Sequence, residues 1–304
     1  MLVLFNGLSH FGNILVNELN KFDTKNKYLF LDTYTSKKAK LLFILLLPFS
    51  KLVVSFNGVS DRSGSMDWVL RFKKKLLMQW QGTDVLLATE RMKRGTIFRK
   101  YLDYAIHTTD FIYLQKELEP ILEHISLLPY KYCSSNKVEV SNYQQLTVLT
   151  YVAKNREQFY GIDKIELLAK EFPSVTFFVV GTDNKKVSML SNIQILGWVD
   201  QQLLTQLMRE HPIFIRLTEH DGNSVTVLEA LKNGQEVIWT YPSPYVYHAS
   251  NENELLLHFH NILKIVEERG MVSNQINSNY VISNFQRDKI LSNYVHFLNN
   301  LVNS

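Results

Sequence analysis

The sequence has little of what secreted and membrane-spanning proteins need. Its 304 residues include one cysteine, Cys133, so an internal disulfide and a cysteine-based zinc site are both excluded. The apolar run LLFILLLP at 41–48 is far shorter than the roughly 20 residues that cross a bilayer. The first residues lack the basic lead and apolar core of a signal peptide. We therefore expect a cytoplasmic protein.

Charge of one sign is also scarce. The formal net charge is only +4, which argues against a nucleic-acid partner. Positive residues nevertheless gather around the apolar run, as Lys37, Lys38, Lys40 and Lys51. Lysines beside an apolar face predict either peripheral contact with an anionic membrane or a buried core helix with lysines at its ends. The sequence leaves both interpretations open.

Several catalytic signatures are missing. The chain has no Asp-x-Asp triad, no Gly-x-Ser-x-Gly turn, no phosphate-loop lysine motif and no His-Glu-x-x-His motif. Its histidines and its single cysteine do not have zinc-ligand spacing. We therefore predict a site without a metal and without a cofactor.

What the sequence does contain is an alternation of short apolar runs with amphipathic stretches. Runs such as 51–56, 146–151 and 213–217 are typical of strands, and each is followed by a loop and a helical pattern. The polar stretch Tyr130–Asn142 separates two such series. The expected fold class is α/β, with two Rossmann-like, doubly wound parallel-sheet domains that face a cleft.

The predicted domains span 1–135 and 143–284, and a last helix occupies 285–304. In open α/β sheets, ligands bind beyond the carboxyl ends of the strands. The residues that follow each strand are therefore the candidates for a site.

The most informative stretch is RLTEHDGNSVTVLE, from Arg216 to Glu229. It places a polar, glycine-containing loop between a strand and a helix. The positive end of that helix can hold a diphosphate, with Ser224 or Asn223 as its cap. Glu229 follows about one and a half helical turns later, where a carboxylate can accept hydrogen bonds from the two hydroxyls of a ribose.

This stretch, with ALKNGQEVI after it, resembles the acidic–seven residues–Glu signature of retaining GT-B glycosyltransferases of the family 4 type. The resemblance implies that Asp221 lies beside the transferred sugar, although the family usually has Glu there and Glu219 can share the role. It assigns Gly222, Asn223 and Ser224 to the phosphate turn and Glu229 to the ribose. It also implies that the helix at 285–304 crosses back to the first domain.

Matches to the same family extend through the second half of the chain. Residues 151–163 resemble the loop that supplies an Arg and a Lys to the diphosphate, but Tyr160 stands where the Lys is expected. We therefore consider Lys154, Arg156 and Arg216 as the cations that match the charge of the leaving diphosphate. Residues 192–200 resemble the strand and turn beneath the nucleotide base, which makes Gly197 and Trp198 candidates for the base pocket.

In the first half, two residues follow predicted strands and could act as the base for an acceptor hydroxyl. His10 lies in the loop Gly7–Gly12, which resembles the acceptor-side loop of the family. Asp84 ends the stretch WQGTD, which resembles a strand end in some bacterial members.

The sequence therefore predicts a glycosyltransferase of the hexosyltransferase type. It would move a sugar from a nucleotide sugar, bound as a substrate and not as a cofactor, to a glycan or lipid-linked saccharide acceptor. By resemblance, the anomeric configuration would be retained. Two alternatives stay open: a GT-B nucleotide-sugar epimerase, and a non-catalytic homologue that acts as a glycosylation partner or scaffold.

Overall fold

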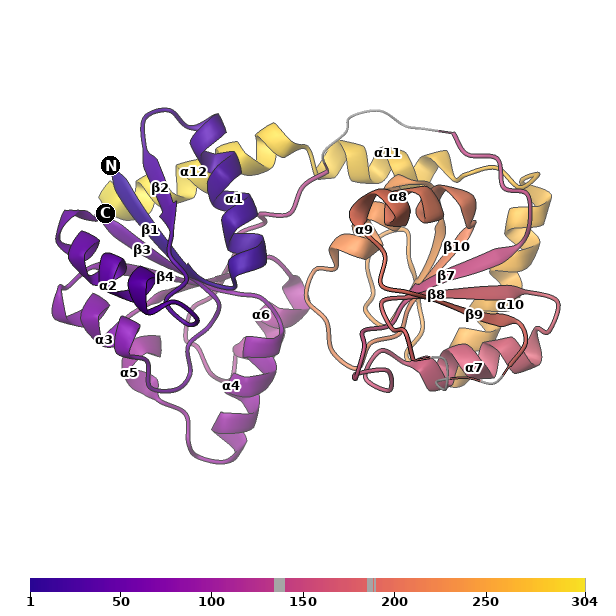
Figure 1. Ribbon diagram of the computed structural model, residues 1–304, viewed down its shortest axis with the longest axis horizontal. Helices are drawn as coiled ribbons and strands as arrows, with labels where there is room; N and C mark the ends of the chain where they lie inside the picture. Colours follow the sequence, from indigo (N-terminus) through magenta and orange to yellow (C-terminus); the bar gives the residue numbers. More distant parts are fainter. Residues whose placement is uncertain (134–139, 185–187, 189, 304) are drawn as a thin grey trace. The chain divides into compact units, whose positions relative to one another are not determined.

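The computed structural model describes residues 1–133, 140–184, 188 and 190–303. The chain divides into two compact units (Figure 1). Unit 1 comprises Met1–Tyr132 and Arg287–Ser304, and unit 2 comprises Cys133–Gln286. The predicted linker Tyr130–Asn142 and the predicted boundary at residue 135 fall partly on 134–139, which lie outside the described residues.

Unit 1 is built on a six-stranded sheet in the order β2-β1-β3-β4-β5-β6, with all neighbours parallel. After β1 the chain turns to one side for β2 and then to the other side for β3, so the strand order reverses between β1 and β3. The central strand β3 is buried along its whole length and β4 is buried after Lys75, as expected when helices cover both faces of a parallel sheet. The strands are β1 Leu2–Gly7, β2 Lys27–Phe30, β3 Leu52–Phe56, β4 Lys75–Trp80, β5 Ile106–Thr109 and β6 Ser126–Leu127.

Helices from both ends of the chain cover one face of this sheet. Leu15 and Leu19 of α1 and Leu291 and Leu298 of α12 pack in one core with the apolar side chains of β1 and β3. Figure 1 shows the other helices of unit 1 on the opposite face. The helices are α1 Ser9–Phe22, α2 Lys37–Leu46, the short 3₁₀ helix η1 Leu47–Phe49, α3 Gly64–Arg71, α4 Thr83–Lys93, α5 Arg99–Leu102, α6 Ile112–Leu118 and α12 Arg287–Asn303.

Unit 2 repeats this architecture with the order β12-β11-β10-β7-β8-β9, again with parallel neighbours. Here the strand order reverses between β7 and β10. The loops that leave these two strands therefore flank the crevice where ligands of doubly wound sheets bind. The strands are β7 Thr147–Tyr151, β8 Thr176–Val180, β9 Ile193–Gly197, β10 Ile213–Arg216, β11 Glu236–Trp239 and β12 Tyr247–His248.

Two helices of unit 2 share a core on one face of its sheet. Ile165 of α7 and Phe259 of α10 pack with Phe177 and Ile215 of the strands. Figure 1 shows α8, α9 and α11 on the other face. The helices are α7 Ile162–Glu171, α8 Gln201–Glu210, α9 Val225–Lys232, α10 Glu252–Glu268 and α11 Gln275–Asn284.

The predicted α/β class with two doubly wound parallel sheets is confirmed, but the sequence analysis missed several elements. The helix α11 was not predicted because it buries Asn277 and Ser278 beside Val281 and so has no apolar stripe. The helix α4 was also missed, since residues 81–84 were interpreted only as the close of a strand. Among the described residues, no helix is long and apolar enough to cross a membrane.

Candidate functional site at the strand ends

The strand β10 ends on a buried ion pair. Arg216, its last residue, binds Asp221 through two hydrogen bonds, and the one from Nη2 to Oδ1 is 3.1 Å long. The side chains of Arg216 and Asp221 are only 10% and 13% exposed. The backbone N–H of Asp221 also donates to the hydroxyl of Tyr241, which follows β11. Two predicted site residues are thus brought together, and each neutralises the other.

The helix α9 starts directly after this loop. Ser224 is its N-cap, because its hydroxyl accepts a hydrogen bond from the backbone N–H of Val227 at 3.4 Å. Gly222 is buried and Asn223 is half-buried just before the cap. The positive end of α9 therefore lies at the carboxyl edge of β10, as the interpretation of this stretch requires.

Glu229 lies one and a half turns into α9 and is half-buried. Its carboxylate accepts a hydrogen bond from the side-chain amide of Gln201, in the first turn of α8, at 3.2 Å. Burial raises the pKa of Glu229 above its ordinary value, while Lys232 and Gln201 act in the opposite direction. A second lone pair and a second oxygen remain for a ligand, because the Gln201 bond uses only Oε1.

The loop between β7 and α7 places an aromatic cluster against the same ion pair. The ring of Tyr160 packs edge-on against Tyr151, with ring centroids 5.5 Å apart. The guanidinium of Arg216 lies over both rings, 5.6 Å from the Tyr160 centroid and 6.0 Å from that of Tyr151. At the position where the family pattern expects a lysine, this chain therefore has a ring that contacts a cation.

The other two candidate cations differ in their partners. Lys154 forms an exposed ion pair with Asp183 at 2.9 Å. Arg156 stacks on the ring of Phe159, 4.0 Å from its centroid, and makes no ion pair with another described residue. Of the three predicted cations, Arg156 is therefore the one whose charge is not already matched by a carboxylate of the described chain.

Close approach of two backbones holds the β7–α7 and β10–α9 loops together. Gly161, the N-cap of α7, has φ +71°, and a Cβ there would lie 2.4 Å from the carbonyl oxygen of Leu217. The backbone N–H of Glu219 donates to the carbonyl of Phe159 at 2.9 Å. These contacts fix Tyr160 beside Arg216.

We expect Gly161→Ala to lower the free energy of unfolding by more than the ~1–2 kcal/mol that left-handed backbone costs an L residue, because overlap with the Leu217 carbonyl adds to it. Gly95→Ala is the matched control, since Gly95 has φ +66° and an added Cβ would meet nothing within 4 Å. Urea unfolding of both variants measures the difference. Equal losses would contradict a tight approach of the two loops.

The remaining candidates of unit 2 lie at neighbouring strand ends. Gly197 closes β9 with φ +81°, and Trp198 after it is 79% exposed. Glu219 is exposed and lines a cavity of about 360 Å³ at the ends of β10 and β11, together with Thr218, Thr240 and Tyr241. Tyr241 was not predicted; its position directly after β11 was the available signal.

The two candidates of unit 1 have different surroundings. His10 is exposed in the first turn of α1 and packs against the ring of Phe11. Asp84 accepts hydrogen bonds of 2.5–3.2 Å from the backbone N–H groups of Gly58, Gln81, Gly82 and Val85. Burial raises the pKa of Asp84, although these bonds oppose the shift. Its carboxylate thus ties the ends of β3 and β4 together.

A further charged pair at the strand ends of unit 1 was missed. Asp110 follows β5, and its buried carboxylate binds the Lys131 ammonium at 2.9 Å. That ammonium also lies 5.8 Å from the ring centroid of Phe11, in the helix that follows β1. The acidic residue directly after a strand was the available signal, but nothing in the sequence indicates Lys131 as its partner.

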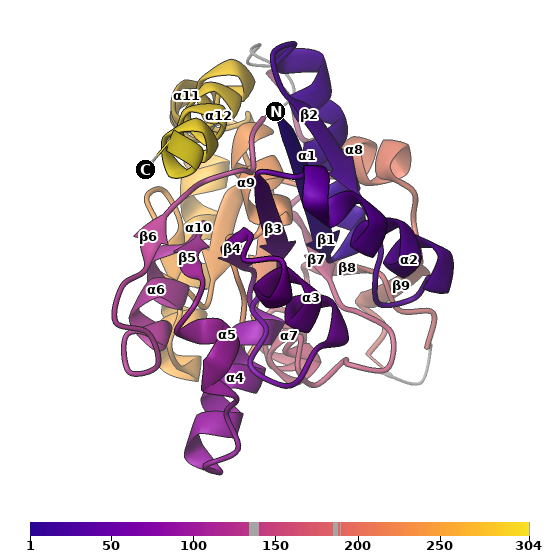
Figure 2. The same cartoon turned by 90° about the vertical axis from the view of Figure 1, so that its left-hand side faces the viewer.

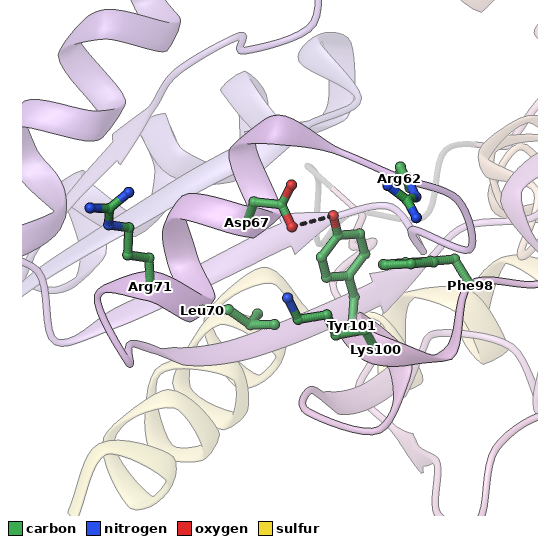
Figure 3. Close-up of a pocket in the computed structure, with 7 residues that line it drawn as sticks. All are labelled: Arg62, Asp67, Leu70, Arg71, Phe98, Lys100 and Tyr101. Carbon is green, nitrogen blue, oxygen red and sulfur yellow. Dashed lines mark hydrogen bonds between the residues drawn. The ribbon is translucent and has the colours of Figure 1, made fainter.

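Unit 1 also has a larger cavity, of about 720 Å³, between α3 and α5 (Figure 3). Tyr101 donates to Asp67 across it at 2.8 Å. Three cations line it, Arg62, Arg71 and Lys100. Among the residues that the structure describes, no group of three His, Cys, Asp or Glu side chains could hold a metal ion.

Neither a protein-family model nor a curated protein sequence matches this chain. Solved structures do match. The pneumococcal O-GlcNAc transferase GtfA, in complex with UDP and GlcNAc, has a TM-score of 0.61 and 13% identity, over 86% of this chain. This chain spans only 60% of the GtfA chain.

Two other neighbours match over nearly the full length of both chains. Anabaena HepE, in complex with UDP and glucose, has a TM-score of 0.66 and 11% identity over 99% of this chain and 100% of its own. A putative UDP-N-acetylglucosamine 2-epimerase from Listeria monocytogenes has a TM-score of 0.53 and 9% identity over 98% and 96%. With two parallel six-stranded sheets flanked by helices, this chain has the fold of the GT-B glycosyltransferases.

Proposed function

We propose that this chain is a glycosyltransferase that binds a nucleotide sugar at the carboxyl edge of the unit 2 sheet and transfers its sugar to an acceptor hydroxyl. The observation that carries the proposal is the turn between β10 and α9. A capped helix start and a half-buried carboxylate one and a half turns later lie beside the β7–β10 switch point. Two neighbours of the same fold were solved with UDP and a sugar.

Each residue of this turn has a role in the proposal. The backbone N–H groups at the start of α9, after Gly222 and Asn223, hold the diphosphate. Glu229 accepts hydrogen bonds from the ribose hydroxyls. The exposed ring of Trp198, held beyond the turn at Gly197, packs on the nucleotide base.

Charge develops on the diphosphate as the glycosidic bond to it breaks. In this proposal Arg156 matches that charge, and Lys154 and Arg216 join it once they leave Asp183 and Asp221. Asp221 and Glu219 lie at the sugar end of the same loop. We further propose that the sugar is transferred with retention, without a metal, to a glycan or lipid-linked saccharide. His10 and Asp84 stay the proposed bases on the acceptor side.

A nucleotide-sugar epimerase is the second candidate, because an epimerase is among the neighbours that match nearly the whole chain. The two functions differ in what an acceptor does. A transferase releases nucleoside diphosphate only when an acceptor is present, whereas an epimerase converts the donor without one.

The test begins with the thermal stability of the chain in the presence of UDP-, GDP-, ADP- and TDP-sugars. A donor that binds the native state raises the melting temperature by mass action. Release of nucleoside diphosphate is then followed with and without saccharide acceptors, and NMR of the product gives its anomeric configuration. We expect acceptor-dependent release and a retained configuration. A chain that no nucleotide sugar stabilises would support the non-catalytic scaffold instead.

A further inference from the structure

The helix α2 exposes an apolar stripe to solvent. Leu41, Leu42, Leu45 and Phe49 are 61%, 43%, 59% and 74% exposed, whereas Phe43 and Leu47 on the inner side are fully buried. The exposed positions recur three or four residues apart, so they lie on one face of α2 and its extension η1. Single exposed leucines are ordinary, but a contiguous apolar face marks an interaction surface.

This observation argues against one of the two interpretations that the sequence left open for residues 37–51, the buried core helix. A core helix would bury its leucines and expose its lysines. Here the leucines and the lysines are exposed together, since Lys37 and Lys38 at one end and Lys51 at the other are also exposed. The apolar face of α2 is therefore not part of the core of unit 1.

The charge around the stripe has one sign. Residues 37–75 include nine lysines and arginines but only two aspartates, although the net charge of the whole chain is +4. Both aspartates already have partners: Asp61 binds Arg91 and Asp67 accepts from Tyr101. In contrast, Lys37, Lys38, Lys51 and Lys73 make no ion pair with any described residue.

The neighbouring helix α3 extends this surface. Figure 2 shows α2 and α3 side by side in the same layer, and a Cβ on Gly64 of α3 would lie 3.3 Å from the Lys40 ammonium. Trp68 of α3 contacts Phe72, the C-cap of this helix, and the Arg71 guanidinium lies 5.1 Å from the centroid of the Trp68 ring.

The cavity beyond α3 continues the excess of positive charge. Figure 3 shows Arg71 at one end of it, Arg62 at the other and Lys100 between them. None of these three cations forms an ion pair with a described residue, so their charges are available to an anion.

We propose that this outer layer, α2 with η1 and α3, docks on an anionic lipid bilayer. The stripe enters the boundary between headgroups and acyl chains, and the surrounding lysines and arginines contact lipid phosphates. An aliphatic face without hydrogen-bonding groups matches acyl chains, and the excess of nine lysines and arginines over two aspartates among residues 37–75 matches a negative surface. The proposal does not depend on the nucleotide-sugar site.

The experiment is flotation of the full chain with phosphatidylcholine vesicles, with and without phosphatidylglycerol. We expect binding only to the anionic vesicles, weakening as salt is added. Leu41→Ser combined with Leu45→Ser is expected to reduce binding at least tenfold. The matched control combines Leu257→Ser with Ile276→Ser, which removes two equally exposed apolar side chains from unit 2 and should leave binding unchanged.

A charge variant tests the second half of the proposal. Each lysine near an anionic surface contributes about a fivefold gain in partitioning, so Lys37→Gln with Lys38→Gln should reduce binding roughly twenty-five-fold. Lys170→Gln with Lys289→Gln, two exposed lysines on α7 and α12, is the control. Circular dichroism confirms that each variant folds.

Three outcomes would overturn the proposal. One is equal binding to neutral and anionic vesicles, and another is equal binding by the stripe variant and its control. The third is concentration-dependent self-association that Leu41→Ser with Leu45→Ser abolishes while vesicles stay unbound, which would assign the stripe to a second copy of this chain. None of these results depends on turnover, so they leave the proposed transferase activity untouched.

Discussion

A Glu229→Ala variant is expected to bind the nucleotide sugar about ten- to a hundredfold more weakly than the parent chain. Hydrogen bonds to a charged group contribute about 1.5–3 kcal/mol, and each 1.4 kcal/mol is about a tenfold change in affinity. Calorimetric titration with the donor found by thermal shift measures the loss. A Glu229→Ala variant that binds as tightly as the parent would show that Glu229 does not bind the ribose. The proposed site would then lose its main support.

A matched control for this variant lies on α8. Glu210 accepts a hydrogen bond from the amide of Gln206 at 2.7 Å, as Glu229 does from Gln201, but it is exposed at the far end of its helix. Glu210→Ala should leave donor binding unchanged.

The pH dependence gives a second check on Glu229. Burial raises the pKa of this carboxyl in the ligand-free chain, and a bound ribose favours the ionised form. Donor binding therefore releases a proton, and affinity should fall as the pH is lowered through that raised pKa. The Glu229→Ala variant should lack this part of the pH dependence.

Replacing Arg216 with methionine is expected to lower the free energy of unfolding by about 3 kcal/mol. Removing one partner of a buried ion pair leaves the other charge desolvated, which costs about 3–5 kcal/mol. Asp221 keeps a small exposed fraction and the hydrogen bond between its backbone and Tyr241, so the lower end of that range applies. Urea unfolding of the ligand-free chain measures it.

Two further variants separate the ion pair from the packing of the Arg216 side chain. Adding Asp221→Asn to Arg216→Met should restore part of the loss, since no unmatched charge then remains. Lys154→Met breaks the exposed pair with Asp183 and should cost less than about 1 kcal/mol. Similar losses for Arg216→Met and Lys154→Met would show that Arg216 and Asp221 are well solvated.

The central strands β3 and β10 were predictable from the sequence because each is a short, mostly apolar run that a parallel sheet buries on both faces. The two-residue strands β6 and β12 give no such signal. The helix α11 gives a misleading one, since it packs polar side chains such as Asn277 against the body of unit 2. The helical spacing of apolar residues indicates which face of a helix is buried. It fails to predict a helix that buries hydrogen-bonded polar side chains instead.

The candidate site was predictable as a set of positions but not as a set of partners. Residues that follow strands gather at the carboxyl edge of the sheet whatever their identity. This rule was enough to predict Arg216, Asp221 and Ser224 as site candidates. That Arg216 would bind Asp221 and lie over Tyr160 depends on how the loops fold back, and the backbone approach at Gly161 controls this. No local pattern encodes such a contact between loops more than fifty residues apart in the sequence.

The composition of unit 1 from both ends of the chain has a consequence for biosynthesis. Unit 2 is continuous, so a ribosome releases all of its sequence before the last element of unit 1 exists. Until α12 emerges, the apolar faces of α1 and β1 lack Leu291, Tyr294 and Leu298 as their cover. The apolar faces of the nascent N-terminal half therefore stay partly uncovered while unit 2 is synthesised. During that interval this half of the chain is most exposed to aggregation and to chaperones.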